Sequence, residues 1–246
     1  MKEYRADLHV HTVLSPCGDV EMSPENILVT ARSKNIDILG ITDHNHTGNA
    51  WLIKEMAEEF QMLVLPGAEV TTLEEVHCLV FFSSQEALVE FQHFLSGQMI
   101  RIPNRPEVLG YQILVGRGKR VIDEVQYYLG ASVDASVEEV AEMAHSLGGI
   151  FIPAHIDRHK NSLYSQLGFI PSGLPFDAVE VSWRTTLDAF TVSHPEVRGL
   201  RTVRSSDAHF LSDIGRITSV FLLEELTCDE VWMAFRGENG RKIIVA

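Results

Sequence analysis

The chain is organised around Ala6-Asp-Leu-His-Val-His-Thr12, an apolar run ending in two histidines that is typical of a first β-strand. Because side chains alternate between the faces of a strand, His9 and His11 point the same way and can reach one metal ion. A His-x-His pair alone is a weak signal, since surface and core histidines with ordinary hydrogen bonds also form such pairs. The pair gains weight because His, Asp and Glu follow several other strand-like segments.

Length and composition are those of a folded globular protein. The chain has 246 residues, 45% hydrophobic and 22% charged, and α/β barrels reach such lengths as single domains of roughly 200–250 residues. Cys17, Cys78 and Cys228 have no paired spacing, which argues against a disulfide framework and favours a reducing compartment. No apolar run approaches the ~18 residues of a membrane span and no signal-like segment is present, so the sequence predicts a cytoplasmic protein without membrane contact.

The charge balance restricts the class of partner. A formal net charge of −14 argues against extended nucleic-acid binding, which depends on Lys and Arg releasing counterions from phosphates. Divalent ions in a carboxylate-rich pocket would reverse the local charge, so a small anionic substrate remains compatible with this composition.

The first third of the chain alternates between strand-like and helix-like segments. Strands are expected at Ile36–Thr42 and Met62–Leu65, with helices over 24–34 and about 49–60. This rhythm predicts parallel strands with helices outside the sheet. Further along, Glu69–Phe82 is expected to form a hairpin that turns at Glu74.

The hairpin register predicts a second ligand pair. With a turn at Glu74, Glu69 faces Leu79 and His77 becomes its diagonal neighbour on the same face. A less regular insertion is expected at about 97–135, where loop and short helix could cover the mouth of a pocket.

The second half continues the alternation. Ser136 and Glu139 form a capping box that predicts a helix to residue 147. The remaining expected elements are strands at 150–154, 177–181, 201–205 and 218–222, and a closing helix at 226–236. Seven or eight strands of this kind close into a barrel more readily than they form an open sheet. Active sites of such barrels lie at the carboxyl ends of the strands.

Eight potential metal ligands follow these strands, where a barrel would bring them to one rim. They are His9, His11, His44, Glu69, His77, His155, Asp207 and His209.

The motifs that carry these residues resemble the polymerase and histidinol phosphatase (PHP) family. They are Asp7-Leu-His-Val-His11, Ile41-Thr-Asp-His44, Pro66-Gly-Ala-Glu69, His77, Pro153-Ala-His155 and Ser206-Asp-Ala-His209. The chain looks most like the family's stand-alone metal-dependent phosphoesterases. The resemblance implies one PHP domain over residues 1–246, a distorted (β/α)7 TIM-like barrel, and a trinuclear metal centre.

The resemblance also implies a ligand set. One ion would be held by His9, His11, Glu69 and Asp207. Glu69 would bridge to a second ion bound by His77 and His155, and a third would take His44, His209 and a residue of the first loop.

Two residues compete for the place of that loop ligand. Asp19 fits when the sequence is counted back from the helix start at Ser23-Pro24, and Cys17 fits when it is counted forward from His11. We expect Asp19, because a carboxylate suits hard, oxygen-tolerant metals, whereas Cys17 would bias the site toward zinc.

Asp43, Arg158 and His209 are the candidates for catalysis. Asp43 is either an acceptor that fixes a histidine tautomer or a helix-start cap. Arg158 is either a phosphate clamp or one half of a structural ion pair, and Arg184 is a weaker candidate of the same kind. His209 could protonate the leaving group. The other histidines are assigned ordinary structural roles: His46, His93, His145, His159 and His194.

The expected activity is hydrolysis of a phosphate monoester or diester by water activated at divalent ions, with Mn, Fe or Zn as the metals. The expected substrate is a small phosphorylated molecule, including a nucleotide or short oligonucleotide. The alternatives are an exonuclease or oligonucleotide phosphatase, a histidinol-phosphatase-like enzyme, and a non-catalytic metal-stabilised binding module.

Overall fold

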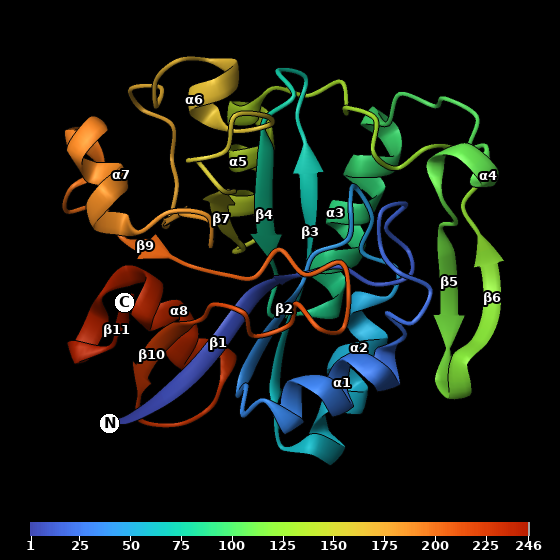
Figure 1. Cartoon of the computed structure of the whole chain (residues 1–246), viewed down its shortest axis with the longest axis horizontal. Coiled ribbons are helices and arrows are strands. Elements are labelled where there is room, and N and C mark those ends of the chain that lie inside the picture. The colour runs from blue at the N-terminus through green and yellow to red at the C-terminus, as the bar shows by residue number, and fades with distance from the viewer. Residues whose placement is uncertain (246) are drawn as a thin grey trace.

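The computed structural model describes residues 1–245 and contains a curled, seven-stranded mixed sheet with helices packed around it (Figure 1). The strand order is β11-β10-β1-β2-β3-β4-β7. These strands are β1 Lys2–Val10, β2 Ile38–Ile41, β3 Leu63–Thr71, β4 His77–Phe81, β7 Ile150–Pro153, β10 Ser219–Leu223 and β11 Lys242–Ile244. Two short parallel strands, β8 Val179–Glu180 and β9 Thr202–Val203, form a separate sheet.

The predicted parallel βαβαβ unit is confirmed for the first three strands. β1 pairs in parallel with β2, and β2 with β3. Buried side chains of α1 Pro24–Ser33 and α2 Ala50–Ala57 pack with those of these strands in one hydrophobic cluster. The helices therefore cover this part of the sheet as the sequence predicts.

The rest of the sheet departs from a regular (β/α)7 barrel. β4 is antiparallel to both β3 and β7, and β10 is antiparallel to both β1 and β11. A short turn over residues 72–76 makes β3 and β4 antiparallel without a crossover helix, whereas long segments separate β4 from β7 and β1 from β10. The described residues form a curled half-barrel, and the closed (β/α)7 barrel of the sequence analysis stays a prediction.

The remaining helices flank the sheet or its connections. They are α3 Gln85–Gln98, α4 Pro106–Leu109, α5 Val137–Ser146, α6 Leu163–Gln166, α7 Leu187–Ser193 and α8 Cys228–Arg236. Single 3-10 turns occur at Glu58–Phe60, Arg117–Lys119, Pro195–Val197 and Glu238–Gly240. Among residues 1–245, no helix combines the length and the apolar character needed to cross a membrane.

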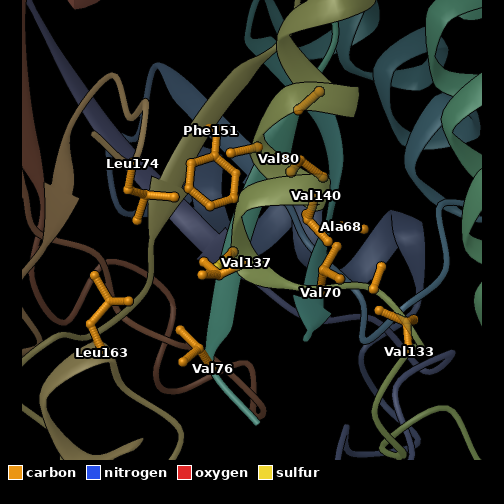
Figure 2. Packing of buried hydrophobic residues seen from close by; sticks show 14 of the residues in the cluster. Ala68, Val70, Val76, Val80, Val133, Val137, Val140, Phe151, Leu163 and Leu174 are labelled. Carbon is orange, nitrogen blue, oxygen red and sulfur yellow. The ribbon is translucent and has the colours of Figure 1, made fainter. Parts of the chain in front are cut away.

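A large core lies between the sheet and α3 and α5. Figure 2 shows Val70 and Val80 of the β3-β4 hairpin beside Val137 and Val140 of α5, with Phe151 of β7 packed among them. All five are fully buried. This packing anchors the hairpin that carries Glu69 and His77.

The capping box at the start of α5 is confirmed and predicts a modest effect on stability. The Ser136 hydroxyl accepts a hydrogen bond from the Glu139 amide, and the Glu139 carboxylate accepts one from the Ser136 amide. We expect Ser136→Ala to lower the free energy of unfolding by about 1 kcal/mol, a fall in Tm of about 2–4 °C. Urea unfolding of Ser136→Ala and Ser136→Asp tests this, since Asp keeps the acceptor and should be nearly neutral.

The insertion is more regular than expected. It contains a hairpin of β5 Ile113–Gly116 and β6 Arg120–Glu124, which the sequence analysis did not predict. Both strands are short, and β6 is mostly exposed while β5 is half-buried to buried, so neither shows the alternating pattern that identifies strands. The insertion packs on the first loop, where Leu14 joins Val125 and Leu129 in a small apolar cluster.

Candidate metal centre

The carboxyl end of β1 meets the loop after β9. The amide of His11 donates to the carbonyl of Ala208 at 3.0 Å, and the amide of Ala208 donates to the carbonyl of His9 at 3.0 Å. These bonds place Asp207 beside His9 and His11, as a barrel rim would. The imidazole rings of His9 and His11 point to the same side, with centroids 5.1 Å apart, as strand alternation predicts.

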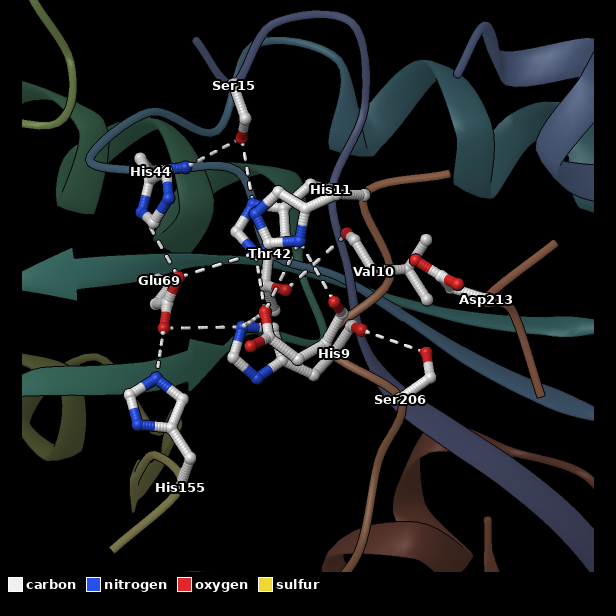
Figure 3. A network of polar contacts seen from close by, with 12 residues as sticks. His9, Val10, His11, Ser15, Thr42, His44, Glu69, His155, Ser206 and Asp213 are labelled. Atoms are coloured by element: carbon white, nitrogen blue, oxygen red, sulfur yellow. Dashed lines mark hydrogen bonds and ion pairs between the residues drawn. The ribbon is translucent and has the colours of Figure 1, made fainter. Parts of the chain in front are cut away.

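Glu69 lies at the centre of the cluster in Figure 3. Its side chain is 1% exposed, and five imidazoles approach its two oxygens. The shortest nitrogen-to-oxygen distances are 3.3 Å for His9, 3.4 Å for His11, 3.1 Å for His44, 2.8 Å for His77 and 3.0 Å for His155. The observed register pairs Glu69 with Leu79 and confirms the predicted hairpin.

Asp207 forms the second carboxylate of the cluster. Its Oδ1 lies 3.5 Å from Nε2 of both His9 and His11 and 3.6 Å from Nδ1 of His209. Its Oδ2 accepts a hydrogen bond from the Arg158 guanidinium at 2.7 Å. Asp207 and His155 both have positive φ, +52° and +30°, and such strained backbone is often found at functional sites.

Burial and neighbouring charges set the protonation of the cluster. Burial alone would raise the pKa of Glu69, but the surrounding histidines hold it well below its usual value. Burial would lower the pKa of His9, but Glu180, Glu69 and Asp207 together raise it well above its usual value. Burial, reinforced by His209, lowers the pKa of His11 to about 4. The cluster thus presents an ionised Glu69 and a neutral His11, which is the protonation state of a metal ligand.

Several buried nitrogens in the cluster fit a metal better than a hydrogen-bond network. Among the described residues, four buried imidazole nitrogens have no hydrogen-bond partner: His9 Nε2, His11 Nε2, His44 Nδ1 and His155 Nδ1. Such atoms are costly to bury unless something satisfies them. Three triads have ligand atoms within 4.8 Å of one another: His9, His11 and Glu69; His44, Glu69 and His77; and His11, His44 and His209. Imidazole and carboxylate donors suit Zn, Mn or Fe.

Glu180 is a buried residue beside the cluster that the sequence analysis did not assign to the site. Its carboxylate, 1% exposed, accepts a hydrogen bond from His9 Nδ1 at 3.1 Å and one from the His155 amide at 2.9 Å. The first bond favours a proton on Nδ1, so Nε2 is the nitrogen of His9 that binds a cation once metal binding displaces the second proton. The only sequence signal was its place at the end of an expected strand.

Asp43 is connected to His11 of the cluster through the hydroxyl group of Ser15. The Ser15 hydroxyl donates to Asp43 Oδ1 at 2.7 Å and accepts from His11 Nδ1 at 2.9 Å. Asp43 also accepts from the amide and hydroxyl of Thr12, both at 2.7 Å. Of the two roles considered for Asp43, these contacts favour the one that orients a ligand.

The two candidate loop ligands occupy different environments. Asp19 Oδ1 accepts from the Glu21 amide at 2.9 Å, and the Asp19 amide donates to the His209 carbonyl at 2.9 Å. Desolvation, together with the carboxylates of Glu69 and Asp207, raises the pKa of the Cys17 thiol to about 12, so Cys17 is within electrostatic reach of the cluster. Asp19 stays a prediction as the ligand.

The other histidines and Arg184 lie outside the cluster. His145 is paired with Asp177 at 2.9 Å, and His46 Nδ1 accepts from the Gly48 amide. His93 is exposed, and His194 stacks on Phe190 with ring centroids 4.3 Å apart. Arg184 lies over the Trp183 ring, and His159 lines a cavity with Arg158.

Comparisons with known proteins agree with this architecture. The sequence is 26% identical to the uncharacterized protein YqxK of Bacillus subtilis over 99% of this chain and 65% of YqxK. The fold matches the lesion-specific endonuclease PfuEndoQ of Pyrococcus furiosus with a TM-score of 0.71 and 20% identity over 98% of this chain and 58% of that one. An Endonuclease Q complex with a 27-mer duplex substrate, with an abasic lesion at the active site, gives the same values.

A further match has nearly the same length as this chain. A candidate metal-dependent phosphoesterase from Bifidobacterium adolescentis has a TM-score of 0.60 and 20% identity, over 92% of this chain and 94% of that one. No family model matches the sequence. These likenesses show the fold, while this chain spans less than two thirds of YqxK and PfuEndoQ.

Proposed function

We propose that this protein is a metal-dependent hydrolase of phosphate esters with a PHP-type site. The observation that carries the proposal is the convergence of five imidazoles on the buried Glu69 carboxylate, beside Asp207 and with buried nitrogens free to bind cations. A merely structural network would satisfy those nitrogens with hydrogen bonds.

The ligand assignment follows the motifs and is compatible with the contacts. His9, His11, Glu69 and Asp207 would hold one cation. Glu69, His77 and His155 would hold a second, and His44, His209 and Asp19 a third. Divalent cations bound by such residues lower the pKa of water from 15.7 to about 7 and neutralise charge on a phosphoryl group.

Other residues of the chain would orient the metal ligands and neutralise the charge of the phosphate. Glu180 fixes His9, and the Asp43-Ser15 pair fixes His11. Arg158 bonds Asp207 through one guanidinium nitrogen and also lines the adjacent cavity, so its remaining N–H groups can meet a phosphate. His209 Nδ1 is 2.9 Å from the Asp207 carbonyl, and donation to that carbonyl leaves Nε2 available as a ligand or as a base.

The comparisons support a phosphate ester of a nucleotide or nucleic acid over other esters. PfuEndoQ is a lesion-specific endonuclease, and its fold is matched with the higher TM-score, 0.71 against 0.60 for the candidate phosphoesterase. A nucleotide or short oligonucleotide is therefore the substrate we propose, with cleavage of lesion-containing duplex DNA as the second candidate.

Metal analysis of freshly purified protein, followed by hydrolysis assays with added Mn²⁺, tests the proposal. The panel contains p-nitrophenyl phosphate, bis(p-nitrophenyl) phosphate, mononucleotides, short oligonucleotides and a duplex with an abasic site. We expect stoichiometric transition metal and hydrolysis of at least one ester, both lost on chelation. Bound metal without turnover of any ester would favour the non-catalytic binding module.

A further inference from the structure

A cavity of about 550 Å³ opens beside the metal centre. It lies between the segment after β7 and the segment from β8 to α7, and Arg158 belongs to both the cavity and the cluster. Arg158 lines the cavity and donates to Asp207 at 2.7 Å, so the cavity lies next to the site. A molecule whose phosphate lies at the cluster would extend into it.

The cavity is strongly basic in an acidic protein. Its walls include Arg158, Lys160, Arg184, His159 and His194, whereas the whole chain has a formal net charge of −14. Low-dielectric walls lined by one sign of charge concentrate the field and attract counter-ions. This local excess of cations therefore favours an anionic ligand.

The one acidic residue of the cavity, Asp157, offsets only one of the three positive charges of Arg158, Lys160 and Arg184. Both oxygens of Asp157 accept hydrogen bonds from Ser182, at 2.7 Å from its amide and 2.6 Å from its hydroxyl. Asp157 also interacts with the charge of Arg204, whose guanidinium donates to the carbonyls of Ser182 and Thr185. The segment that carries Arg184 is thus fixed by the hydrogen bonds from Ser182 to the Asp157 carboxylate.

Lys160 and Arg184 are available to bind a phosphate of the ligand other than the phosphate that is cleaved at the metal centre. Both side chains are exposed, and neither is in an ion pair with the acidic groups of residues 1–245. Arg184 lies over the Trp183 ring at 4.7 Å from its centroid, which restrains the guanidinium without using its donors. Arg158 is already bonded to Asp207, whereas no hydrogen bond or ion pair joins Lys160 or Arg184 to the described residues of the cluster.

We infer that Lys160 and Arg184 form a subsite for a second phosphate of the substrate, one nucleotide away from the phosphate at the metal centre. This inference rests on the proposed function and makes it more specific. It selects substrates with at least two phosphates, such as a nucleoside bisphosphate or an oligonucleotide strand, over simple monoesters. It also explains how an acidic protein can bind a polyanion through a short local contact.

The test uses matched chromogenic esters with and without a second phosphate. They are thymidine 5′-(p-nitrophenyl phosphate) with a free or phosphorylated 3′-hydroxyl, and the corresponding 3′-(p-nitrophenyl phosphate) pair. In at least one pair, we expect the bisphosphate to have a roughly tenfold higher kcat/KM, from one or two charge-assisted contacts. Lys160→Ala/Arg184→Ala should abolish this preference and leave kcat/KM for the mono-phosphorylated ester unchanged.

A control variant separates local contact from net charge. Lys119→Ala/Arg120→Ala removes the same charge from the β5-β6 hairpin, on the opposite side of the molecule from α7 (Figure 1), and should keep the preference. Raising the salt concentration should reduce the bisphosphate preference of the unmodified protein toward the absence of preference expected for Lys160→Ala/Arg184→Ala. Absence of preference in both pairs, or equal losses on both esters in the cavity variant, would overturn the subsite.

Calorimetry distinguishes failure of the subsite from failure of the proposed function. The metal-loaded protein is titrated with thymidine 3′,5′-bisphosphate and with thymidine 5′-monophosphate. Tighter binding of the bisphosphate that is lost in Lys160→Ala/Arg184→Ala supports the subsite even if neither ester is cleaved. Cleavage without any bisphosphate preference supports the hydrolase and rejects the subsite.

Discussion

Glu69→Gln is expected to lower kcat for any ester that the protein hydrolyses by about 10³-fold or more. Glutamine keeps the shape of the side chain but removes the charge that five imidazoles face, and it offers one oxygen in place of two. Breaking a buried charged pair typically costs about 3–5 kcal/mol, which corresponds to a factor of roughly 10²–10⁴ in an equilibrium constant. Loss of metal should therefore accompany loss of turnover.

The measurement combines metal content, steady-state kinetics and circular dichroism. Glu75→Gln is the matched control, because Glu75 lies in the same hairpin and is exposed, so metal content and kcat should match those of the unmodified protein. A Glu69→Gln protein with full metal content and normal kcat would contradict the central role of this carboxylate. A variant that fails to fold would be recognised by its spectrum, and His44→Ala, at the edge of the cluster, then provides the substitute measurement.

The positions of the site residues could be predicted because motif and strand end coincide. His9 and His11 follow from alternation along β1, and Glu69 and His77 follow from a hairpin register that the structure confirms. Each prediction depended only on local geometry, which sequence encodes directly. The convergence of these pairs was inferred from the barrel expectation, and the observed contacts agree with it.

The features that were missed depend on tertiary contacts. Glu180 lies on a two-residue strand, and nothing in its neighbourhood identifies it as the partner of His9, 171 positions away. The antiparallel pairing of β10 with β1 was also missed, because apolar strands look alike whatever their direction. The basic cavity joins residues near 158 and 184 through an Arg204 network that no local pattern predicts.

Glu180→Gln should weaken metal binding without abolishing the chemistry. The substituted amide can no longer accept from both His9 Nδ1 and the His155 amide with a full negative charge, so the His9 ring loses its fixed orientation. Loss of such a partner typically costs 10–100-fold in metal affinity. We expect the Mn²⁺ concentration for half-maximal activity to rise by roughly that factor, while kcat at saturating Mn²⁺ stays within about tenfold.

The Mn²⁺ dependence of activity distinguishes a positioning role of Glu180 from a merely structural one. Glu138→Gln is the control, because Glu138 is exposed in the first turn of α5 and its substitution should leave the Mn²⁺ dependence unchanged. If Glu180→Gln instead lowers activity by the same factor at every Mn²⁺ concentration, the carboxylate does not act through the ligands. Recovery at high Mn²⁺ would show that the buried carboxylate serves to hold His9 ready for a cation, since added metal can compensate for weaker binding but not for a lost reacting group.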